Sequence, residues 1–283
     1  MSPSEQEPEV ALEDIKIKAD TLIRSINDIR YSDENIAVNE REYLLKVPGV
    51  GFFYARDGNT IEYSAEKGAD PQWVQLYMNN HVLVALLHQR KIISFHASSF
   101  ILGGRGVMVL GETGAGKTSL TVAFTINGAE FLSDDLSPVV FRDKVPHIWS
   151  LTRKVKLRQD SVEQLNLNEG SLSEAETGTG KKYLDIKKAS EEYHKIDIIV
   201  KIETGDVNEP VFVNLSASDR FSLLRSEVCS WEILAGMPET EAAYLQQLVK
   251  ILEQVHFVKV IRPPGITIAG MHHALNQYLE SLL

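Results

Sequence analysis

The stretch that decides the fold is Gly111-Glu-Thr-Gly-Ala-Gly-Lys-Thr118. Its order of a glycine, four further residues and Gly-Lys-Thr is typical of a loop that binds phosphate. Glycines allow the backbone to turn tightly and to point several N–H groups into one concavity, and the following helix start adds partial positive charge. The pattern therefore predicts an anion site; the alternative is a glycine-rich turn without a ligand.

The loop pattern also predicts the kind of ligand, a nucleotide with Mg²⁺. Lys117 is long enough to reach the terminal phosphates, and the Thr118 hydroxyl is a candidate metal ligand. The predicted nucleotide-binding residues are Gly111, Thr113, Gly114, Ala115, Gly116, Lys117, Thr118 and Ser119.

The residues on both sides of the loop support this interpretation. Gly106–Leu110 is a short apolar run that ends at the first glycine, as a buried parallel strand does. Thr118–Asn127 has Leu120, Ala123 and Phe124 on one side, which predicts a helix that ends near Asn127-Gly128. Strand, loop and helix thus follow one another in the order that a phosphate site requires.

Composition sets wider limits on what the chain does. The 283 residues include 43% hydrophobic and 24% charged residues, an ordinary globular balance. The net charge of −10 argues against a nucleic-acid partner, because phosphate backbones attract basic surfaces. We expect a mixed α/β fold that carries the phosphate loop in its larger part.

The single cysteine and the absence of a signal-peptide or membrane-span pattern indicate the cell compartment and the role of the thiol. The single cysteine, Cys229, allows no intramolecular disulfide, and a packed thiol is favoured over a nucleophile. The acidic start has no signal-peptide pattern, and no run of about 18 apolar residues predicts a membrane span. We therefore expect a cytoplasmic protein without a membrane partner, with a homo-oligomer left open.

Periodicity predicts the organisation of the chain. Residues 1–40 read as an N-terminal extension, disordered over 1–10 and helical over Glu13–Arg30. Residues 41–90 read as a small antiparallel β meander followed by a helix over Pro71–Gln89. Residues 91–283 read as the catalytic domain, with a polar, mobile loop over Asn168–Gly180.

Asp134 and Asp135 follow the short predicted strand Ala129–Ser133. The carboxyl ends of parallel strands form the ligand edge of an α/β sheet, so both carboxylates are expected near the phosphates. Carboxylates in that position hold Mg²⁺ or accept a proton from an attacking hydroxyl. A solvated acidic turn is the alternative interpretation.

His96, the loop and Leu132-Ser-Asp-Asp135 together resemble the HPr kinase/phosphorylase superfamily, whose nucleotide core phosphoenolpyruvate carboxykinase shares. The resemblance covers about residues 43 to 283 and is closer to members that lack a regulatory domain, among them kinases that modify a serine of lasso peptide precursors. It implies a P-loop core with a mixed sheet. It also implies that Lys117 binds phosphates and that Asp134, Asp135 and His96 act in catalysis.

The resemblance leaves several roles open. One aspartate would hold Mg²⁺ with Thr118 and the other would act as base. The sequence does not assign the two roles to Asp134 and Asp135. His96 would orient or charge that pair, and otherwise is a structural histidine. A second cation on the transferred phosphate is expected from Lys181, Lys182 or Arg225. The basic run Arg153, Lys154, Lys156 and Arg158 faces either an acidic peptide or phosphate, or solvent.

Two departures separate the chain from the main HPr kinase pattern. Ser119 stands where that group has a glutamate, and residues 180–210 lack its glycine-rich signature with an arginine. These departures argue against HPr as substrate and against phosphorolysis.

The resulting expectation is an Mg²⁺- and ATP-dependent kinase acting on a hydroxyl, most simply a serine of a peptide or small protein, with a lasso precursor as one example. The alternatives are a small-molecule kinase and a nucleotide-binding regulator without transfer. A GTPase is disfavoured because the sequence has no Asn-Lys-x-Asp motif.

Overall fold

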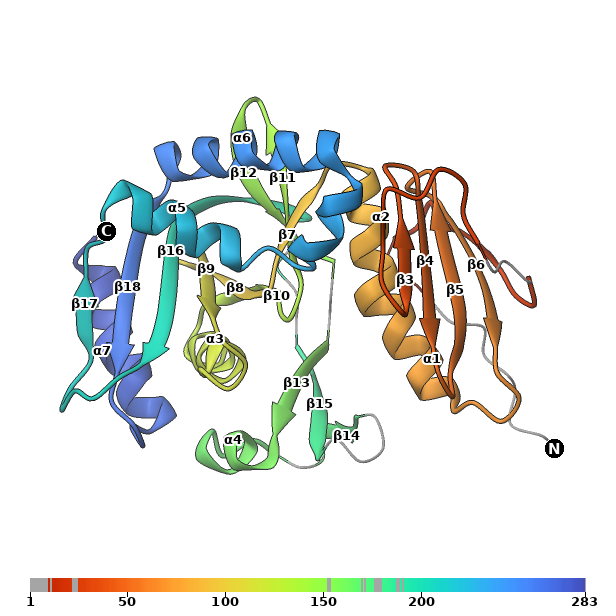
Figure 1. Ribbon diagram of the computed structural model, residues 1–283. Helices are drawn as coiled ribbons and strands as arrows, with labels where there is room; N and C mark the ends of the chain where they lie inside the picture. The colour runs from red at the N-terminus through yellow and green to blue at the C-terminus, as the bar shows by residue number, and fades with distance from the viewer. Residues whose placement is uncertain are drawn as a thin grey trace. The chain divides into compact units, whose positions relative to one another are not determined.

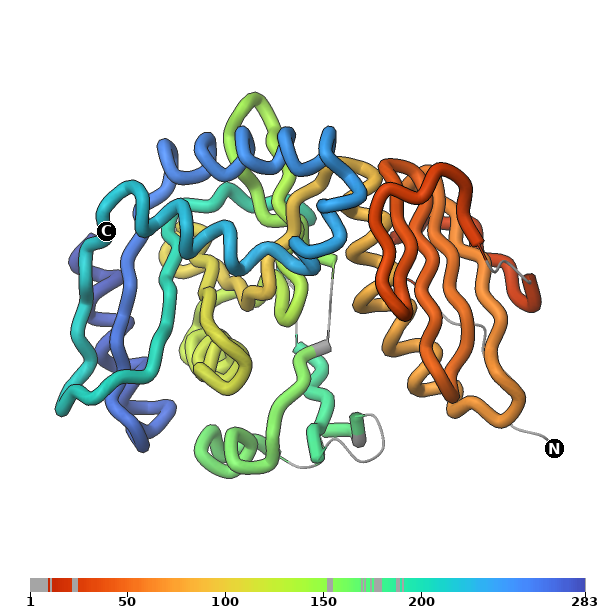
Figure 2. Tube along the Cα trace, viewed as in Figure 1, coloured from red at the N-terminus to blue at the C-terminus, as the bar shows by residue number. Residues whose placement is uncertain are grey.

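A computed structural model describes residues 10, 12–21, 25–151, 154–168, 170, 172–175, 180–186, 189 and 191–282. The chain divides into two compact units (Figures 1 and 2). The first unit joins Met1–Ile93 to Ser230–Gln246, and the second joins Ser94–Cys229 to Gln247–Leu283. The domain limits expected from the sequence, at residues 40 and 90, remain predictions.

The first unit contains a six-stranded sheet in the order β1-β6-β5-β4-β3-β2. Its centre is the antiparallel meander that the sequence predicts, with tight turns at Pro48-Gly49 and Gly58-Asn59. The strands are β1 (Lys16–Lys18), β2 (Tyr31–Ser32), β3 (Ile36–Val38), β4 (Glu42–Val47), β5 (Gly51–Arg56) and β6 (Thr60–Ala65).

The helix predicted over Glu13–Arg30 is wrong for the residues that the structure describes. Strand β1 lies there instead and pairs in parallel with β6, with Lys16 opposite Thr60. Asp20 and Asp28 have φ angles of 57° and 44°, which a helix does not allow. The strand forms because β6 offers an edge, and this long-range partner is invisible to local periodicity.

The predicted helix over Pro71–Gln89 is confirmed with one irregularity. It consists of α1 (Pro71–Tyr77) and α2 (Leu83–Gln89), joined by the π-helical turn η1 (Met78–Val82). Asp70 caps its start by accepting the Gln72 N–H at 2.9 Å. The apolar face expected from the four-residue steps is buried, and its residues are Val74, Met78, Val82 and Leu86.

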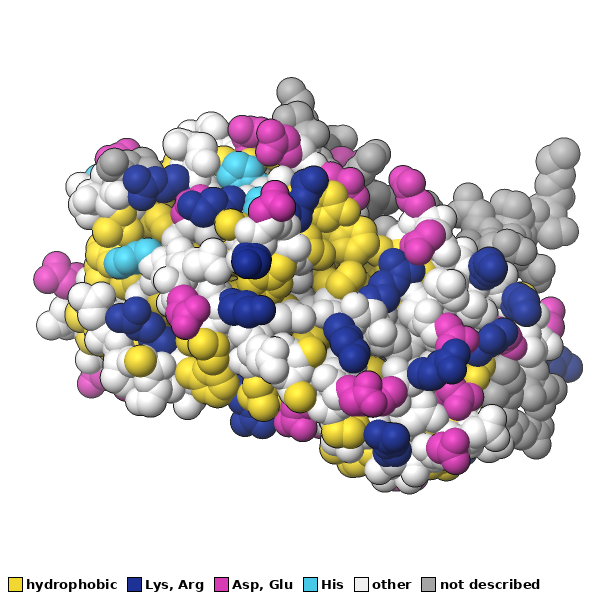
Figure 3. Space-filling view, turned by 90° about the horizontal axis from the view of Figure 1, so that it is seen from above, with side chains coloured by type: hydrophobic (Ala, Val, Ile, Leu, Met, Phe, Trp, Pro, Cys, Tyr) yellow, Lys and Arg dark blue, Asp and Glu magenta, His cyan; other side chains and the backbone are white. Residues whose placement is uncertain are grey.

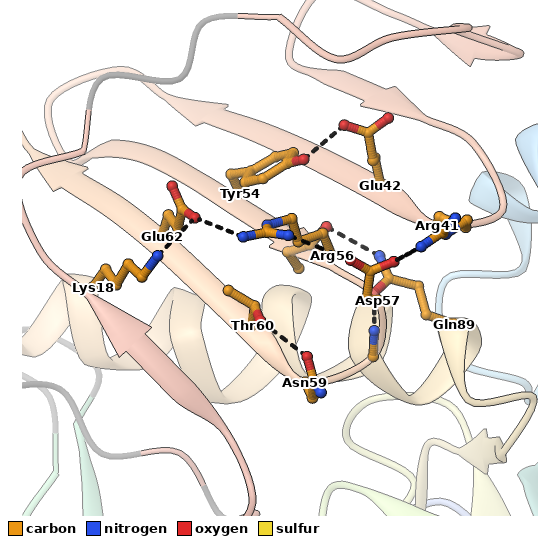
Figure 4. Close-up of polar contacts among 12 residues, drawn as sticks. Lys18, Arg41, Glu42, Tyr54, Arg56, Asp57, Asn59, Thr60, Glu62 and Gln89 are labelled. Atoms are coloured by element: carbon orange, nitrogen blue, oxygen red, sulfur yellow. Dashed lines mark hydrogen bonds and ion pairs between the residues drawn. The ribbon is translucent and has the colours of Figure 1, made fainter.

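Polar side chains link neighbouring strands of this sheet (Figure 4). The Tyr54 hydroxyl donates to Glu42 at 2.6 Å. Glu62 lies between Arg56 at 3.4 Å and Lys18 at 3.7 Å. Glu62 is almost fully buried, so two cations around it offset much of the cost of removing its charge from water.

The second unit is built on a mixed sheet in the order β10-β8-β9-β16-β12-β11-β7, with β18 beside β16 and β17 beside β18. β9 and β18 both run parallel to β16, so their carboxyl ends share one edge. β8 is antiparallel to both β9 and β10 and therefore brings the carboxyl end of β10 to the same edge. The strands are β7 (Ile93–Phe95), β8 (Ala97–Leu102), β9 (Arg105–Gly111), β10 (Glu130–Ser133), β11 (Ser137–Arg142), β12 (Val145–Trp149), β16 (Tyr193–Thr204), β17 (Val211–Val213) and β18 (His256–Arg262).

Helices α3 (Lys117–Ile126) and α7 (Ile268–Glu280) cover one face of this sheet (Figure 1). Their buried side chains, such as Phe124 and Leu275, pack with Val109 and Val200 of the central strands. Further helices are α5 (Ala217–Ser226), the 3₁₀ helix η3 (Trp231–Gly236) and α6 (Pro238–Gln254). None of the helices in the described part of the chain has the length and apolar character that crossing a bilayer requires.

A separate three-stranded sheet, in the order β13-β15-β14, completes the second unit. Its strands are β13 (Lys154–Arg158), β14 (Leu172–Glu174) and β15 (Lys181–Asp185), and α4 (Gln159–Gln164) follows β13. Val155, Leu157 and Leu184 pack against Val122 of α3. The loop predicted over Asn168–Gly180 is therefore partly wrong, because β14 lies within it, where residues 172–174 pair with β15.

Candidate functional site

The glycine-rich loop connects buried strand β9 to helix α3, in the order that the sequence predicts. Gly114 and Gly116 have φ angles of 87° and 98°, in the region that side-chain-bearing residues rarely adopt. Gly111 leaves no room for a side chain, since a Cβ there would lie 2.9 Å from the Ile202 carbonyl oxygen. The loop therefore needs glycine for its turns and for its close approach to β16.

Lys117 is the first residue of α3, and its side chain folds back over the loop. Its Nζ donates to the Gly111 carbonyl at 2.6 Å and approaches that of Glu112 at 3.4 Å. Burial lowers the pKa of this ammonium, while the nearby carboxylates of Glu227, Asp134 and Asp135 oppose that shift. Lys117 thus places a cation within the concavity of the loop.

Asp134 lies just after β10 and is 4% exposed. Its Oδ1 accepts hydrogen bonds from the Thr118 hydroxyl at 2.8 Å and from the Ser98 hydroxyl. Burial raises the pKa of the Asp134 carboxyl to about 6, against the lowering effect of both hydroxyl donors. The first turn of α3 and the ends of β8 and β10 thus meet at one carboxylate oxygen.

Asp135 points elsewhere, although it is the next residue. Its φ of 68° is left-handed, which aspartate tolerates better than most residues, and the chain turns sharply there. As a result the Asp135 side chain is 53% exposed, whereas Asp134 is buried. The two adjacent carboxylates therefore have different surroundings.

His96 lies between β7 and β8, next to Asp135. Its Nδ1 is 3.4 Å from Asp135 Oδ1 and 3.2 Å from the Asp135 carbonyl oxygen. Burial is the main cause that lowers the pKa of His96, and Lys117 lowers it further, while Asp135 raises it. The balance of these effects favours the neutral form of the imidazole.

A cavity of about 320 Å³ joins these groups on the ligand edge of the sheet. Its walls come from the glycine-rich loop, His96 and Asp135, from β13, α4 and β15, and from the segment that links β18 to α7. Of the residues predicted to bind nucleotide, all but Gly111 line it, namely Thr113, Gly114, Ala115, Gly116, Lys117, Thr118 and Ser119.

The lining of the cavity is chemically mixed. Its cations include Lys156 and Arg158 of β13 and Lys181 of β15. Its apolar residues include Ile202, Ile266, Ile268 and Met271, and Arg262 also lines it. The glycine-rich loop lines the same cavity, so a ligand with both a charged and an apolar part fits this lining.

The structure separates the three cations proposed to assist Lys117. Lys181 lines the cavity, but Lys182 and Arg225 are not among its lining residues. In the basic run, Lys156 and Arg158 line it, and Arg153 lies outside the described residues. Ser119 is also there, with its hydroxyl 2.8 Å from that of Ser161 on α4.

Sequence reasoning missed three groups near the site. Ser98 of β8 donates to Asp134, and the available signal was its place in the sequence, two residues after His96. Arg262 lies at the end of β18, and its position emerges only from the sheet order. The third group is an ion pair between Lys201 and Glu227.

Lys201 and Glu227 form this ion pair with side chains 5% and 9% exposed. Lys201 is opposite Leu110 on the neighbouring β9, one residue before the glycine-rich loop begins. Glu227 follows α5, and its carbonyl oxygen accepts the His96 N–H at 2.9 Å. The pair thus connects β16, the end of α5 and the segment that carries His96.

No family model matches the chain, and no curated protein matches it. Among solved structures, the chain is similar to the Hpr(Ser) kinase/phosphatase from Coxiella burnetii, at 11% identity and a TM-score of 0.35, over 67% of this chain and 92% of that chain.

Proposed function

We propose that this protein is an Mg²⁺- and ATP-dependent phosphotransferase that moves the γ-phosphoryl group to a hydroxyl, with a serine of a peptide or small protein as the favoured acceptor. The observation that carries the proposal is the convergence on one cavity of the glycine-rich loop, Lys117, Thr118 and the Asp135–His96 pair. Asp134 supports Thr118 from below this cavity.

The loop fits a triphosphate. Gly114 and Gly116 give the backbone the turns that aim N–H groups into a concavity, and α3 begins there with its positive end. Lys117 holds its ammonium against the Gly111 carbonyl, from which it can move to phosphate oxygens.

The residues beside the loop fit Mg²⁺, which prefers oxygen ligands and shares them with substrate phosphates. Thr118 Oγ1 and Asp134 Oδ1 lie 2.8 Å apart and would hold the ion, directly or through water. The described residues contain no cluster of three or more His, Cys, Asp and Glu that could hold a metal alone. When bound, Mg²⁺ neutralises charge on the transferring phosphate.

The different surroundings of the aspartates support different roles. Asp134 is buried and bonded to Thr118, which suits a metal ligand. Asp135 is exposed to the cavity beside His96, which suits a base for the acceptor hydroxyl. The acceptor oxygen would attack the γ-phosphorus, the bond to the β–γ bridging oxygen would break, and the hydroxyl proton would pass to Asp135.

The apolar residues of the lining suit the base and ribose of a nucleotide. Ile202, Ile266 and Met271 would provide apolar contacts for a flat ring, and Arg262 would provide a donor. Lys181 would support charge on the transferred phosphate or the acceptor. This mixed lining favours a nucleoside triphosphate over a simple anion.

The experiment is a transfer assay with ATP, Mg²⁺ and serine-containing peptides, including lasso precursor peptides, followed by mass spectrometry. We expect an added phosphate on the peptide. Lys117→Ala removes the phosphate cation and Asp135→Asn removes the base, so each is expected to abolish transfer.

Lys250→Glu, an exposed change on α6 outside the cavity lining, serves as a matched control and should leave transfer intact. Full activity in Lys117→Ala or Asp135→Asn contradicts the assignment. ATP binding without transfer to any peptide, but with transfer to a free hydroxy compound, would replace the peptide with a small-molecule acceptor. Binding without any transfer would leave a nucleotide-binding regulator.

A further inference from the structure

Strand β13 has an edge that borders the cavity. In the part of the chain that the structure describes, β13 pairs only with β15, at one end of the order β13-β15-β14. Its consecutive residues Lys156, Leu157 and Arg158 all line the cavity. Successive side chains of a strand point to opposite faces, so lining by all three means that the cavity reaches the edge of the strand.

The two faces of β13 have different surroundings. Val155 and Leu157 are buried in the core beneath α3. Lys156 and Arg158 share the opposite face, where the Lys156 ammonium lies 5.4 Å from the centre of the Tyr183 ring on β15. The inner face therefore holds the strand in place, while the face that carries Lys156 and Arg158 borders the cavity.

Arg158 stands directly opposite Lys181 on the neighbouring strand β15. Like charges in directly opposite positions destabilise a sheet. Among the residues that the structure describes, neither side chain forms a salt bridge, although both line the cavity. The chain carries a net charge of −10, so this cationic pair does not follow from composition.

The cationic pair lies near a third cation and two acids. By the register of β13 and β15, Lys156, Arg158 and Lys181 share one face with Asp185 of β15. The nearest acid in sequence that lines the cavity is Asp160 of α4. On another face of the molecule, seen in Figure 3, basic and acidic side chains are interspersed. The triphosphate has its own partners in the glycine-rich loop and Lys117, which belong to other elements.

We propose that the acceptor is an extended acidic peptide that adds as a strand to the edge of β13 away from β15, with its carboxylates on the face that carries Lys156 and Arg158, and with Lys181 opposite Arg158. Free strand edges are templates for such pairing, in which backbone hydrogen bonds supply affinity and alternate side chains supply specificity. The inference rests on the proposed function, because it names the acceptor that the same cavity takes.

The spacing of the basic residues sets the sequence that the peptide needs. Lys156 and Arg158 are two positions apart on one face, about 7 Å along the strand. A paired peptide presents side chains to that face at every second residue. Acidic residues at alternate positions therefore match the cations, and the same acids at adjacent positions do not, because one would point to the other face.

The test uses fluorescein-labelled synthetic peptides and fluorescence anisotropy without nucleotide, on the full chain. One peptide carries a serine and two glutamates at alternate positions; its isomer has the glutamates adjacent; a third has N-methyl groups on the backbone amides of the alternating peptide. We expect the alternating peptide to bind at least about tenfold tighter than the isomer with adjacent glutamates and than the N-methylated peptide, because charge and backbone pairing act together.

Charge variants of the protein test which of its residues bind the peptide. Arg158→Glu and Lys181→Glu should each weaken the alternating peptide about tenfold or more, and a peptide with lysines in place of the glutamates should regain binding to them. Arg158→Gln and Lys181→Gln remove the charge with less disturbance of the sheet and should weaken binding in the same direction. Lys250→Glu is the matched control and should bind like the wild type.

Equal binding of the two isomers, or undiminished binding of the N-methylated peptide, overturns the inference. Variants that lose affinity for ATP but bind the peptide normally also overturn it, because the cations then serve the nucleotide. The readout needs no catalysis, so peptide binding by a protein that fails to transfer phosphate would contradict the proposed function and leave the peptide site standing.

Discussion

The Thr118 hydroxyl donates to Oδ1 of Asp134 at 2.8 Å, which ties the first turn of α3 to the end of β10. The same oxygen accepts from Ser98 on β8. Three segments that are separate in the sequence are thus organised around one buried carboxylate. The proposed metal site therefore exists in outline before any ion binds, at a cost in stability that can be measured.

Asp134→Asn should stabilise the free protein near neutral pH. The folded pKa of about 6 lies above the ordinary aspartate value, so folding favours the neutral carboxyl. Its stabilising contribution is present below about pH 4 and is lost as the pH rises through about 6, by roughly 3 kcal/mol in all. Asparagine cannot ionise and still accepts from Thr118, so its advantage over the wild type should appear across this range.

Urea denaturation from pH 4 to pH 7.5 measures this difference. Asp135→Asn is the matched control, because the same substitution is made at the exposed neighbour, whose left-handed backbone asparagine also tolerates. Parallel stability curves for Asp134→Asn and the wild type would contradict the prediction. Transfer should nevertheless be lost in Asp134→Asn, because the proposed metal ligand is gone.

Ser98→Ala should weaken the apparent affinity for Mg²⁺, and more so at lower pH. The Ser98 hydroxyl lowers the pKa of Asp134, so its removal raises that pKa further and leaves less carboxylate for the ion. We expect the Mg²⁺ concentration for half-maximal transfer to rise several-fold at pH 6.5 and less at pH 8. Ser99→Ala is the control, since Ser99 contacts Ser137 rather than Asp134; a similar shift in both variants would contradict the assignment.

Gly116→Ala should weaken nucleotide binding in addition to lowering the stability of the protein. Gly116 has a φ of 98°, where a side chain adds strain of about 1–2 kcal/mol. Gly104→Ala is a matched control in the β8–β9 turn, with a φ of 78° and, like Gly116, no atom within 4 Å of an added Cβ. Both variants should lose similar stability in urea denaturation, and only Gly116→Ala should weaken ATP binding by calorimetry.

The effects of mutating Lys201 and Glu227 on the free energy of unfolding should be strongly coupled. Lys201→Met or Glu227→Leu alone leaves an unpaired buried charge, at a cost of about 3–5 kcal/mol in the free energy of unfolding. The double variant replaces both charges with apolar groups of similar size and should return to within about 1 kcal/mol of the wild type. A double-mutant cycle by urea denaturation measures the coupling, and additive single effects would contradict it.

Much of the second unit was predictable because its signals are local. The run Gly106–Leu110, the glycines after it and the apolar face of Thr118–Asn127 mark β9, the loop and α3 without any distant contact. The predicted strands that became β4, β5 and β6 were likewise bounded by turn residues.

The errors lie where a long-range partner decides. Residues 16–18 form a strand because β6 offers an edge, and residues 172–174 form one because β15 lies beside them. Neither segment carries enough periodicity of its own. The cationic cluster of Arg158 and Lys181 also depends on cross-strand register, which residues far apart in the sequence determine together.

The sequence by itself determined the phosphate-binding pattern of residues 111–118 and the candidates His96, Asp134 and Asp135, because residue type and spacing there reflect backbone constraints and chemistry that act over a few positions. Only the tertiary structure decided that Asp134 is buried against Thr118 while Asp135 faces the cavity, since burial and hydrogen bonds arise from the left-handed turn and the packing of β8, β10 and α3. It also brought Lys181 and Arg262 to the lining of one cavity and paired Lys201 with Glu227, because contacts between segments far apart in the sequence arise only when strands and helices pack together.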